Sequence, residues 1–166
     1  MSEGGAPNAA SLRPGSLWAY ALDLYGRPGV EARLLQLQDE HRQNACLLIW
    51  SLWMAAEGRA ADAATLAAGA AMARSWDAAA VEPLRRLRRD LKRASAGPAR
   101  RRERLREGVR ALELKAERML LEMLQDASPA AGPGPLPAAD ALASAAGAWG
   151  APPPANLLHD LAAAAA

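Results

Sequence analysis

NACLLIWSLWMAAEG, residues 44–58, is the stretch of sequence that decides the fold. Only Ser51 and Glu57 are polar among the thirteen residues between Asn44 and Gly58, so a helix formed here is apolar on every side and has to be surrounded by protein. Asn44 can cap the free amides of the first turn, and Gly58 suits the left-handed position just beyond a helix end. These residues give about 20 Å of helix, short of the roughly 30 Å apolar core of a membrane, which favours a buried core helix.

Large side chains cover two faces of this segment. Trp50 and Trp53 are three residues apart and share one face, whereas Leu48 and Leu52 supply another. Two such faces require at least two neighbouring helices. A pair of tryptophans can stack on a ligand, but its position inside an apolar run favours core packing, and that is the role we expect.

Composition favours helices along the whole chain. The 166 residues are rich in alanine, contain no phenylalanine and include few β-branched residues. The single cysteine, Cys46, cannot form an intrachain disulfide, which fits a reducing compartment. The first residues carry no secretion signal and no segment is long enough to span a bilayer, so we predict a cytoplasmic protein without a transmembrane segment.

Residues 16–126 are predicted to form one all-α domain, a single compact bundle of five or six helices around the central apolar helix 44–58. Apolar spacing and capping residues mark the other helices, which we expect at residues 17–25, 29–42, 63–74, 81–91 and 99–125. Pro83 is awkward inside a helix. Either Glu82 caps a helix with Pro83 in its first turn, or a helix begins near Ser75 and bends at Pro83.

The long helix expected at 99–125 carries a narrow apolar seam. Steps of four and three residues separate its members, which corresponds to about three heptads. They are Leu105, Val109, Leu112, Ala116, Met119 and Met123. A helix of this kind packs along one partner, either the preceding helix or another chain.

Both ends of the chain are predicted to be disordered. Residues 1–15 offer little to bury, and residues 127–166 form an Ala/Pro-rich tail: positions 128–166 hold 16 alanines and 7 prolines but no lysine or arginine. The last eleven residues, NLLHDLAAAAA, are either part of this low-complexity tail or a short helix that is offered, as a tethered peptide, to the groove of a partner.

Several motifs in the first half of the chain resemble a known family. They are Trp18, Leu24-Tyr25, the turn Pro28-Gly29-Val30, LQDEH at 37–41 and the apolar run 47–53. Over roughly residues 16–95 the chain resembles an uncharacterised proteobacterial family of helical proteins of about this length, a domain of unknown function. Arg42-Gln43-Asn44 stands where that family leads us to expect a short glycine-containing turn. The resemblance carries no activity, so no functional residue can be transferred.

The sequence offers little for catalysis. Cys46 and His41 are the one conceivable nucleophile–base pair, because the first turn of a helix lowers a thiol pKa, but no third member or oxyanion site accompanies them. We expect His41 to cap the end of its helix instead, and Asp23 to pair with Arg27 four residues on. No catalytic, metal-binding or cofactor-binding residue is predicted. The remaining candidate pocket is lined by Trp18, Asp23, Tyr25 and His41.

A basic block is the strongest feature outside the core. Residues 85–110 carry 12 basic and 3 acidic groups, a net charge of +9, whereas residues 1–84 carry −3 and residues 111–166 carry −4. The two basic runs flank the Gly97-Pro98 turn, so a helical hairpin would gather both at its tip. The candidate anion- or nucleic-acid-binding residues are Arg85, Arg86, Arg88, Arg89, Lys92, Arg93, Arg100, Arg101, Arg102, Arg104 and Arg106.

The basic block has several interpretations. It either solubilises the protein or binds an anionic partner, a phosphate backbone or an acidic protein surface. It holds no aromatic side chain, which disfavours base stacking on single strands. Leu84, Leu87 and Leu91, interleaved with arginine, are also typical of a membrane-surface helix.

Three functions follow from these features. We expect a non-enzymatic helical interaction or adaptor protein with a protein partner, because the core is complete, no catalytic constellation is present and the last helix carries a seam. The alternative is binding of nucleic-acid phosphates by the hairpin 85–106. The third is an enzyme with a site near Asp23 and His41.

Overall fold

A computed structural model of the chain describes residues 15–166, and this part of the chain is helical without strands. The α-helices are α1 (Leu17–Tyr25), α2 (Val30–His41), α3 (Ala45–Ala56), α4 (Ala63–Trp76), α5 (Glu82–Arg93), α6 (Ala99–Asp126), α7 (Ala138–Trp149) and α8 (Ala155–Ala164). The all-α prediction is confirmed, and α1–α6 supply the six helices expected within residues 16–126. None of the helices in this described part combines the length and the apolar character needed to cross a membrane.

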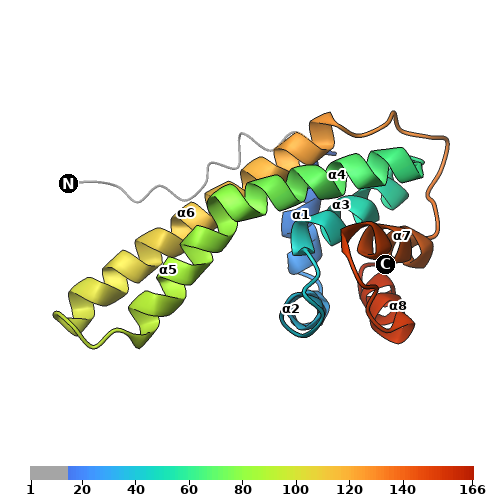
Figure 1. The fold of residues 1–166 in the computed structure, drawn as a ribbon. Coiled ribbons are helices and arrows are strands. Elements are labelled where there is room, and N and C mark those ends of the chain that lie inside the picture. Colours follow the sequence, from blue (N-terminus) through green and yellow to red (C-terminus); the bar gives the residue numbers. More distant parts are fainter. Residues whose placement is uncertain (1–14) are drawn as a thin grey trace.

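The molecule has a head and a projecting hairpin (Figure 1). α4 continues through a π-helical segment (Asp77–Val81) into α5, and α6 returns beside them. The far end of this pair extends beyond the other helices. We call α5 and α6 the hairpin, and we call α1–α4, α7 and α8 the head.

α3 is the centre of the head, as its apolar sequence predicts. Ten of its twelve residues, Cys46–Ala55, are buried. Trp50 is 0% exposed and its Nε1–H donates to Ser128 Oγ at 2.8 Å, while Trp53 is 2% exposed and its Nε1–H donates to the Gly15 carbonyl at 3.2 Å. Both tryptophans therefore belong to the core.

Local capping signals place the helix starts. The side-chain oxygens of Ser16, Asn44 and Asp62 each accept from the backbone N–H three residues on, at 3.1, 3.0 and 2.8 Å, as expected for N-caps. At the other end of α3, Gly58 has the expected left-handed conformation, with φ of 65°. A Cβ on Gly58 would also collide with the Gly134 carbonyl, so only glycine fits this position.

The chain stays helical through Pro83. This residue lies in the first turn of α5, as one alternative predicted, but α5 follows a π-helical segment instead of a cap at Glu82. Pro83 cannot donate to the carbonyl of Ala79, and the π-helical segment holds Ala79 in a wider turn that leaves room for the proline ring. α4 begins at its Asp62 cap and runs into α5 without a new cap at Glu82.

The predicted disorder of residues 127–166 is wrong for both helices in this segment. α7 packs on α3 and α4, and α8 packs on α2 and α7 rather than standing free as a tethered peptide. Leu142, Ala145, Ala146 and Leu161 are all 0% exposed. Small alanines let α7 approach α3 closely, and the prolines precede these helices instead of interrupting them. The predicted disordered lead-in, residues 1–15, lies outside the described residues except for Gly15.

The buried face of α6 is rotated from the predicted seam. Val109 and Ala116 are buried, but Leu105, Leu112 and Met119 are 57%, 52% and 47% exposed. The rotation arises because α6 touches α1 and α3 as well as α5, so several neighbours define its inner face instead of one.

Candidate interaction surfaces

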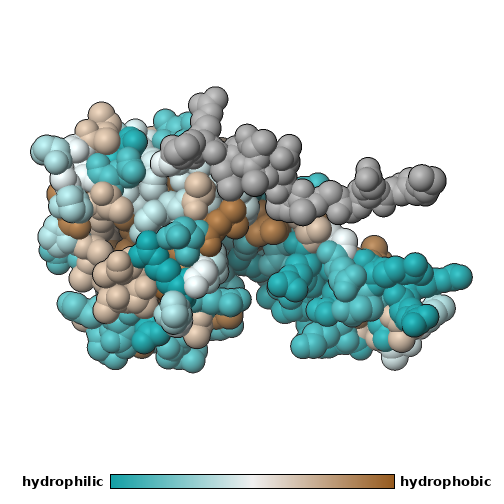
Figure 2. All heavy atoms as spheres, turned by 180° about the vertical axis from the view of Figure 1, so that it is seen from behind, coloured by the Kyte–Doolittle hydropathy of each residue, from teal (hydrophilic) through white to brown (hydrophobic). Residues whose placement is uncertain are grey.

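A cleft with a volume of about 680 Å³ separates the hairpin from the head. α1, α2 and α3 form one wall, and α5 and α6 form the other. Figure 2 shows the molecule hollowed between the two parts, with hydrophobic residues gathered where they meet. Four lining residues are among the most exposed large apolar side chains of the described part of the chain: Leu22 (44%), Tyr25 (43%), Leu35 (48%) and Leu114 (52%).

An ion-pair cluster forms the hairpin wall of this cleft. Glu113 is only 7% exposed and accepts from Arg88 Nε at 2.6 Å and from Arg85 Nε at 3.2 Å. Arg85 also donates to Glu117 Oε1 at 2.7 Å, and its Nη1 lies 3.8 Å from Asp77 Oδ1. The cluster joins the π-helical segment, α5 and α6, so it fixes the hairpin on the head.

The Arg85 guanidinium lies within 4.0 Å of three carboxyl groups, those of Asp77, Glu113 and Glu117, and this sharing affects the pKa values of the cluster. Burial acts to lower the pKa of Arg85, but Glu117, Asp77 and Glu113 together raise it. Burial raises the pKa of Glu117 and of Asp77, because the shared arginine only partly offsets their loss of water. Arg85 is thus a firmly held cation, and the two carboxyls hold protons more tightly than free ones.

The four residues of the predicted pocket do not come together. Trp18 and Tyr25 line the cleft, but Asp23 and His41 are not among its lining residues. Asp23 Oδ2 instead pairs with Arg27 Nη2 at 2.8 Å, as the i,i+4 spacing predicts. His41 occupies the last turn of α2, as expected for a helix-end histidine.

Cys46 is not placed as a reactive thiol. It is 8% exposed within α3, and burial raises its pKa, with Glu117 adding to the effect. A raised pKa leaves the thiol protonated near neutral pH, and a protonated thiol is a poor nucleophile. The structure therefore does not support Cys46 and His41 as a nucleophile–base pair. Within residues 15–166, no three His, Cys, Asp or Glu side chains are grouped as metal ligands.

The basic block divides into paired and unpaired side chains. Arg85 and Arg88 are committed to Glu113, while Arg89 pairs with Glu82, Arg93 with Asp90 and Arg106 with Glu103. Arg102 donates to the Ala96 carbonyl at 3.1 Å. Arg86, Lys92, Arg100, Arg101 and Arg104 have no carboxylate of the described residues within 4.0 Å. The projecting tip therefore carries cations that are open to an anionic partner.

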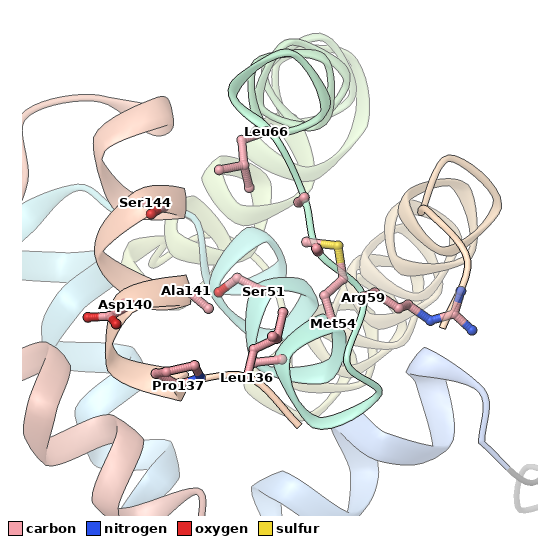
Figure 3. Close-up of a pocket in the computed structure, with 12 residues that line it drawn as sticks. Ser51, Met54, Arg59, Leu66, Leu136, Pro137, Asp140, Ala141 and Ser144 are labelled. Atoms are coloured by element: carbon pink, nitrogen blue, oxygen red, sulfur yellow. The ribbon is translucent and has the colours of Figure 1, made fainter. Parts of the chain in front are cut away.

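A second, smaller pocket of about 240 Å³ lies between α3, α4 and α7 (Figure 3). Met54, Leu66, Leu136 and Ala141 give it mostly apolar walls. Its polar groups do not converge: in Figure 3 the guanidinium of Arg59 and the carboxylate of Asp140 both point away from the space between the helices. Ser51 and Ser144 also line the pocket, and the Ser51 hydroxyl donates to the Leu48 carbonyl at 2.8 Å. The geometry offers no chemistry at this pocket.

Residues 16–124 match the model of a family described as "protein of unknown function (DUF2390)". The chain belongs to this family. The match covers α1–α5 and nearly all of α6, and it includes every wall of the cleft. α7 and α8 lie beyond it. No curated protein and no solved structure matches this DUF2390 chain.

Sequence reasoning missed most residues of the cleft. No pattern in the sequence singled out Leu22, Leu35, Glu113 or Glu117 as candidate site residues. The available signal was the seven-residue stretch LELKAER at 112–118, in which Leu112 and Leu114, on two different faces of the helix, bracket the acidic Glu113. Two apolar faces on one helix indicate two sets of neighbours.

Proposed function

We propose that this DUF2390 protein is a non-enzymatic interaction protein that holds an amphipathic helix of a partner protein in its cleft. The observation that carries the proposal is the exposure of Leu22, Tyr25, Leu35 and Leu114, each 43–52% exposed on walls that face one another. Covering apolar surface releases about 25 cal/mol for each Å², so a binding partner gains most where such side chains are gathered.

The chemistry of the walls defines the partner. The apolar side chains suit a helix that presents apolar residues at positions i, i+4 and i+7. Arg110 lines the α6 wall without a carboxylate of the described residues within 4.0 Å, and it favours an acidic residue at the edge of the bound helix. Glu31 on the α2 wall favours a basic residue at the opposite edge. These charges set the direction of the bound helix, while the apolar contacts supply its affinity.

Affinity capture from the native cell tests this proposal. The wild-type chain is compared with the double variant Leu22→Gln/Leu35→Gln, and Leu136→Gln serves as a control because Leu136 is similarly exposed (39%) but lies outside the cleft. We expect a nuclease-resistant protein partner that the double variant loses and the control retains. Equal capture by all three chains rules the cleft out as the binding surface.

The second candidate is binding of nucleic-acid phosphates by the hairpin tip, supported by the unpaired cations there. Contacts to phosphates release counterions, so the affinity for duplex DNA or RNA should fall steeply as salt increases. Arg100→Glu/Arg101→Glu should abolish it, whereas Arg33→Glu/Lys115→Glu changes the net charge by the same amount away from the tip and should not. Binding that survives the tip variant contradicts this candidate.

For either function, protein binding or nucleic-acid binding, we propose that the protein acts in the cytoplasm. The single buried thiol of Cys46 supports this location, because a reducing compartment keeps cysteines as free thiols.

A further inference from the structure

The side of α6 turned away from the cleft carries an exposed apolar stripe. Leu105, Leu112 and Met119 are about half exposed, and we call them the outer stripe. They are seven residues apart, so they stay within about 40° of one line along the helix and span about 21 Å. On α5, Leu87 is 46% exposed and lies about 200° around the helix from the cleft-facing Arg85. The hairpin thus has an ionic side toward the cleft and an apolar side away from it.

Gly108 lies on the same exposed face, between Leu105 and Leu112. A Cβ at this position would meet no atom within 4 Å, so packing inside the chain gives no reason for a glycine. Glycine weakens the interior of a helix relative to alanine. Its absence of a side chain lets a second helix approach the backbone of α6 closely, which suits an interhelical contact.

We propose that a second copy of this chain covers the outer stripe, with the two α6 helices antiparallel about a twofold axis at Leu112. Leu105 and Met119 are each seven residues from Leu112. A twofold axis at this point places Leu112 of one copy against Leu112 of the other. At each end of the contact, Leu105 of one copy then lies against Met119 of the other. The stripe is therefore complementary to itself, as an interface between identical chains requires.

Charge selects the antiparallel direction. Residues 99–111 hold 6 basic and 2 acidic groups, a net +4, whereas residues 113–126 hold 2 basic and 4 acidic groups, a net −2. Antiparallel pairing sets the basic half of each helix against the acidic half of the other. Arg101 and Arg104, on the exposed flank of the stripe, come within one helical turn of Glu122 and Asp126 of the second copy. Parallel pairing would place the basic halves side by side.

Site-specific disulfide cross-linking tests the pairing and its direction. Single cysteines are placed in a Cys46→Ala background, because Cys46 is the chain's own thiol. Under mild oxidation we expect Leu112→Cys to form covalent dimers, and Leu105→Cys to form them only when mixed with Met119→Cys. Leu114→Cys is the control: it is as exposed as Leu112 (52% each) but faces the cleft, and it should stay monomeric.

Sedimentation velocity of the unmodified chain gives the second readout. We expect a concentration-dependent dimer that Leu112→Glu weakens at least tenfold and that Leu114→Glu leaves unchanged. A wild-type chain that stays monomeric up to about 1 mM overturns the proposal. So does efficient self-cross-linking of Leu105→Cys, which would indicate parallel helices. If the chain is monomeric, a different protein has to cover the outer stripe.

Discussion

Gly69 of α4 is packed against the six-membered ring of Trp50, and replacing it with alanine tests the rigidity of the core. A Cβ on Gly69 would lie 2.5 Å from Trp50 Cζ3 and 2.6 Å from Cη2, about 1 Å closer than ordinary van der Waals contact. Trp50 cannot easily retreat, because it is 0% exposed and its Nε1–H is bonded to Ser128, whose hydroxyl donates to the Leu124 carbonyl at 2.7 Å.

Two opposing effects determine the size of the change. Alanine in place of glycine stabilises a helix interior by about 0.8–1 kcal/mol. Overpacking a close-packed core costs about 1–3 kcal/mol. Gly108→Ala provides the matched control, since it is the same substitution inside a helix but has open space around the new Cβ. The difference between the two variants therefore isolates the overpacking cost, because the helix-propensity gain is common to both.

Urea unfolding of dilute protein measures both variants. We expect Gly69→Ala to destabilise the protein by about 1 kcal/mol, or at least to forfeit the propensity gain, and Gly108→Ala to stabilise it by about 1 kcal/mol. Equal stabilisation by both substitutions would refute the reasoning, because it would mean that Trp50 has room to move.

Three further substitutions test other parts of the structure. Leu161→Ala should cost about 2–5 kcal/mol of unfolding free energy, because Leu161 is fully buried in α8, whereas a disordered tail would show no change in urea unfolding. Glu113→Ala should cost about 3 kcal/mol, because two arginines lose a buried partner, while Glu122→Ala, at an exposed pair, should change the same measurement by less than about 1 kcal/mol. The pKa of Glu117 is raised in the folded state, so the folded protein binds the Glu117 proton more tightly than the unfolded chain does. The contribution of Glu117 to stability is therefore greatest below the ordinary glutamate pKa of 4.5, and it declines as the pH rises. The stability of wild type relative to Glu117→Gln should therefore fall between pH 4 and pH 7, and a rise would show that Arg85 holds Glu117 as a carboxylate.

Local signals in the sequence were sufficient for the N-terminal two-thirds of the fold. Ser16, Asn44 and Asp62 cap the helices that they were expected to cap, because capping depends on a few neighbouring atoms. Trp50 is buried because a helix that is apolar all round leaves no other arrangement.

Features that depend on distant neighbours could not be predicted in the same way. α7 buries Ala145 and Ala146 against α3. This packing could not be predicted, because an alanine-rich sequence flanked by prolines has the composition of a disordered tail as well as that of a closely packed helix. The buried face of α6 depends on its contacts with α1, α3 and α5, and the ion pairs of Glu113 likewise join residues 25 and 28 positions apart. The cleft is assembled from three segments of the chain, so only two of its lining residues, Trp18 and Tyr25, were predicted from the sequence to line a pocket.

Photo-cross-linking from inside the cleft tests most directly that the cleft is where this protein binds its partner. A photoreactive amino acid replaces Leu35 in the native cell, and a matched chain carries it at Leu136, which is similarly exposed outside the cleft. We expect a covalent adduct from position 35 alone, and mass spectrometry of the linked peptide should identify an amphipathic segment with apolar residues at i, i+4 and i+7. Adducts of equal yield from both positions, or no protein adduct from position 35, would contradict the account.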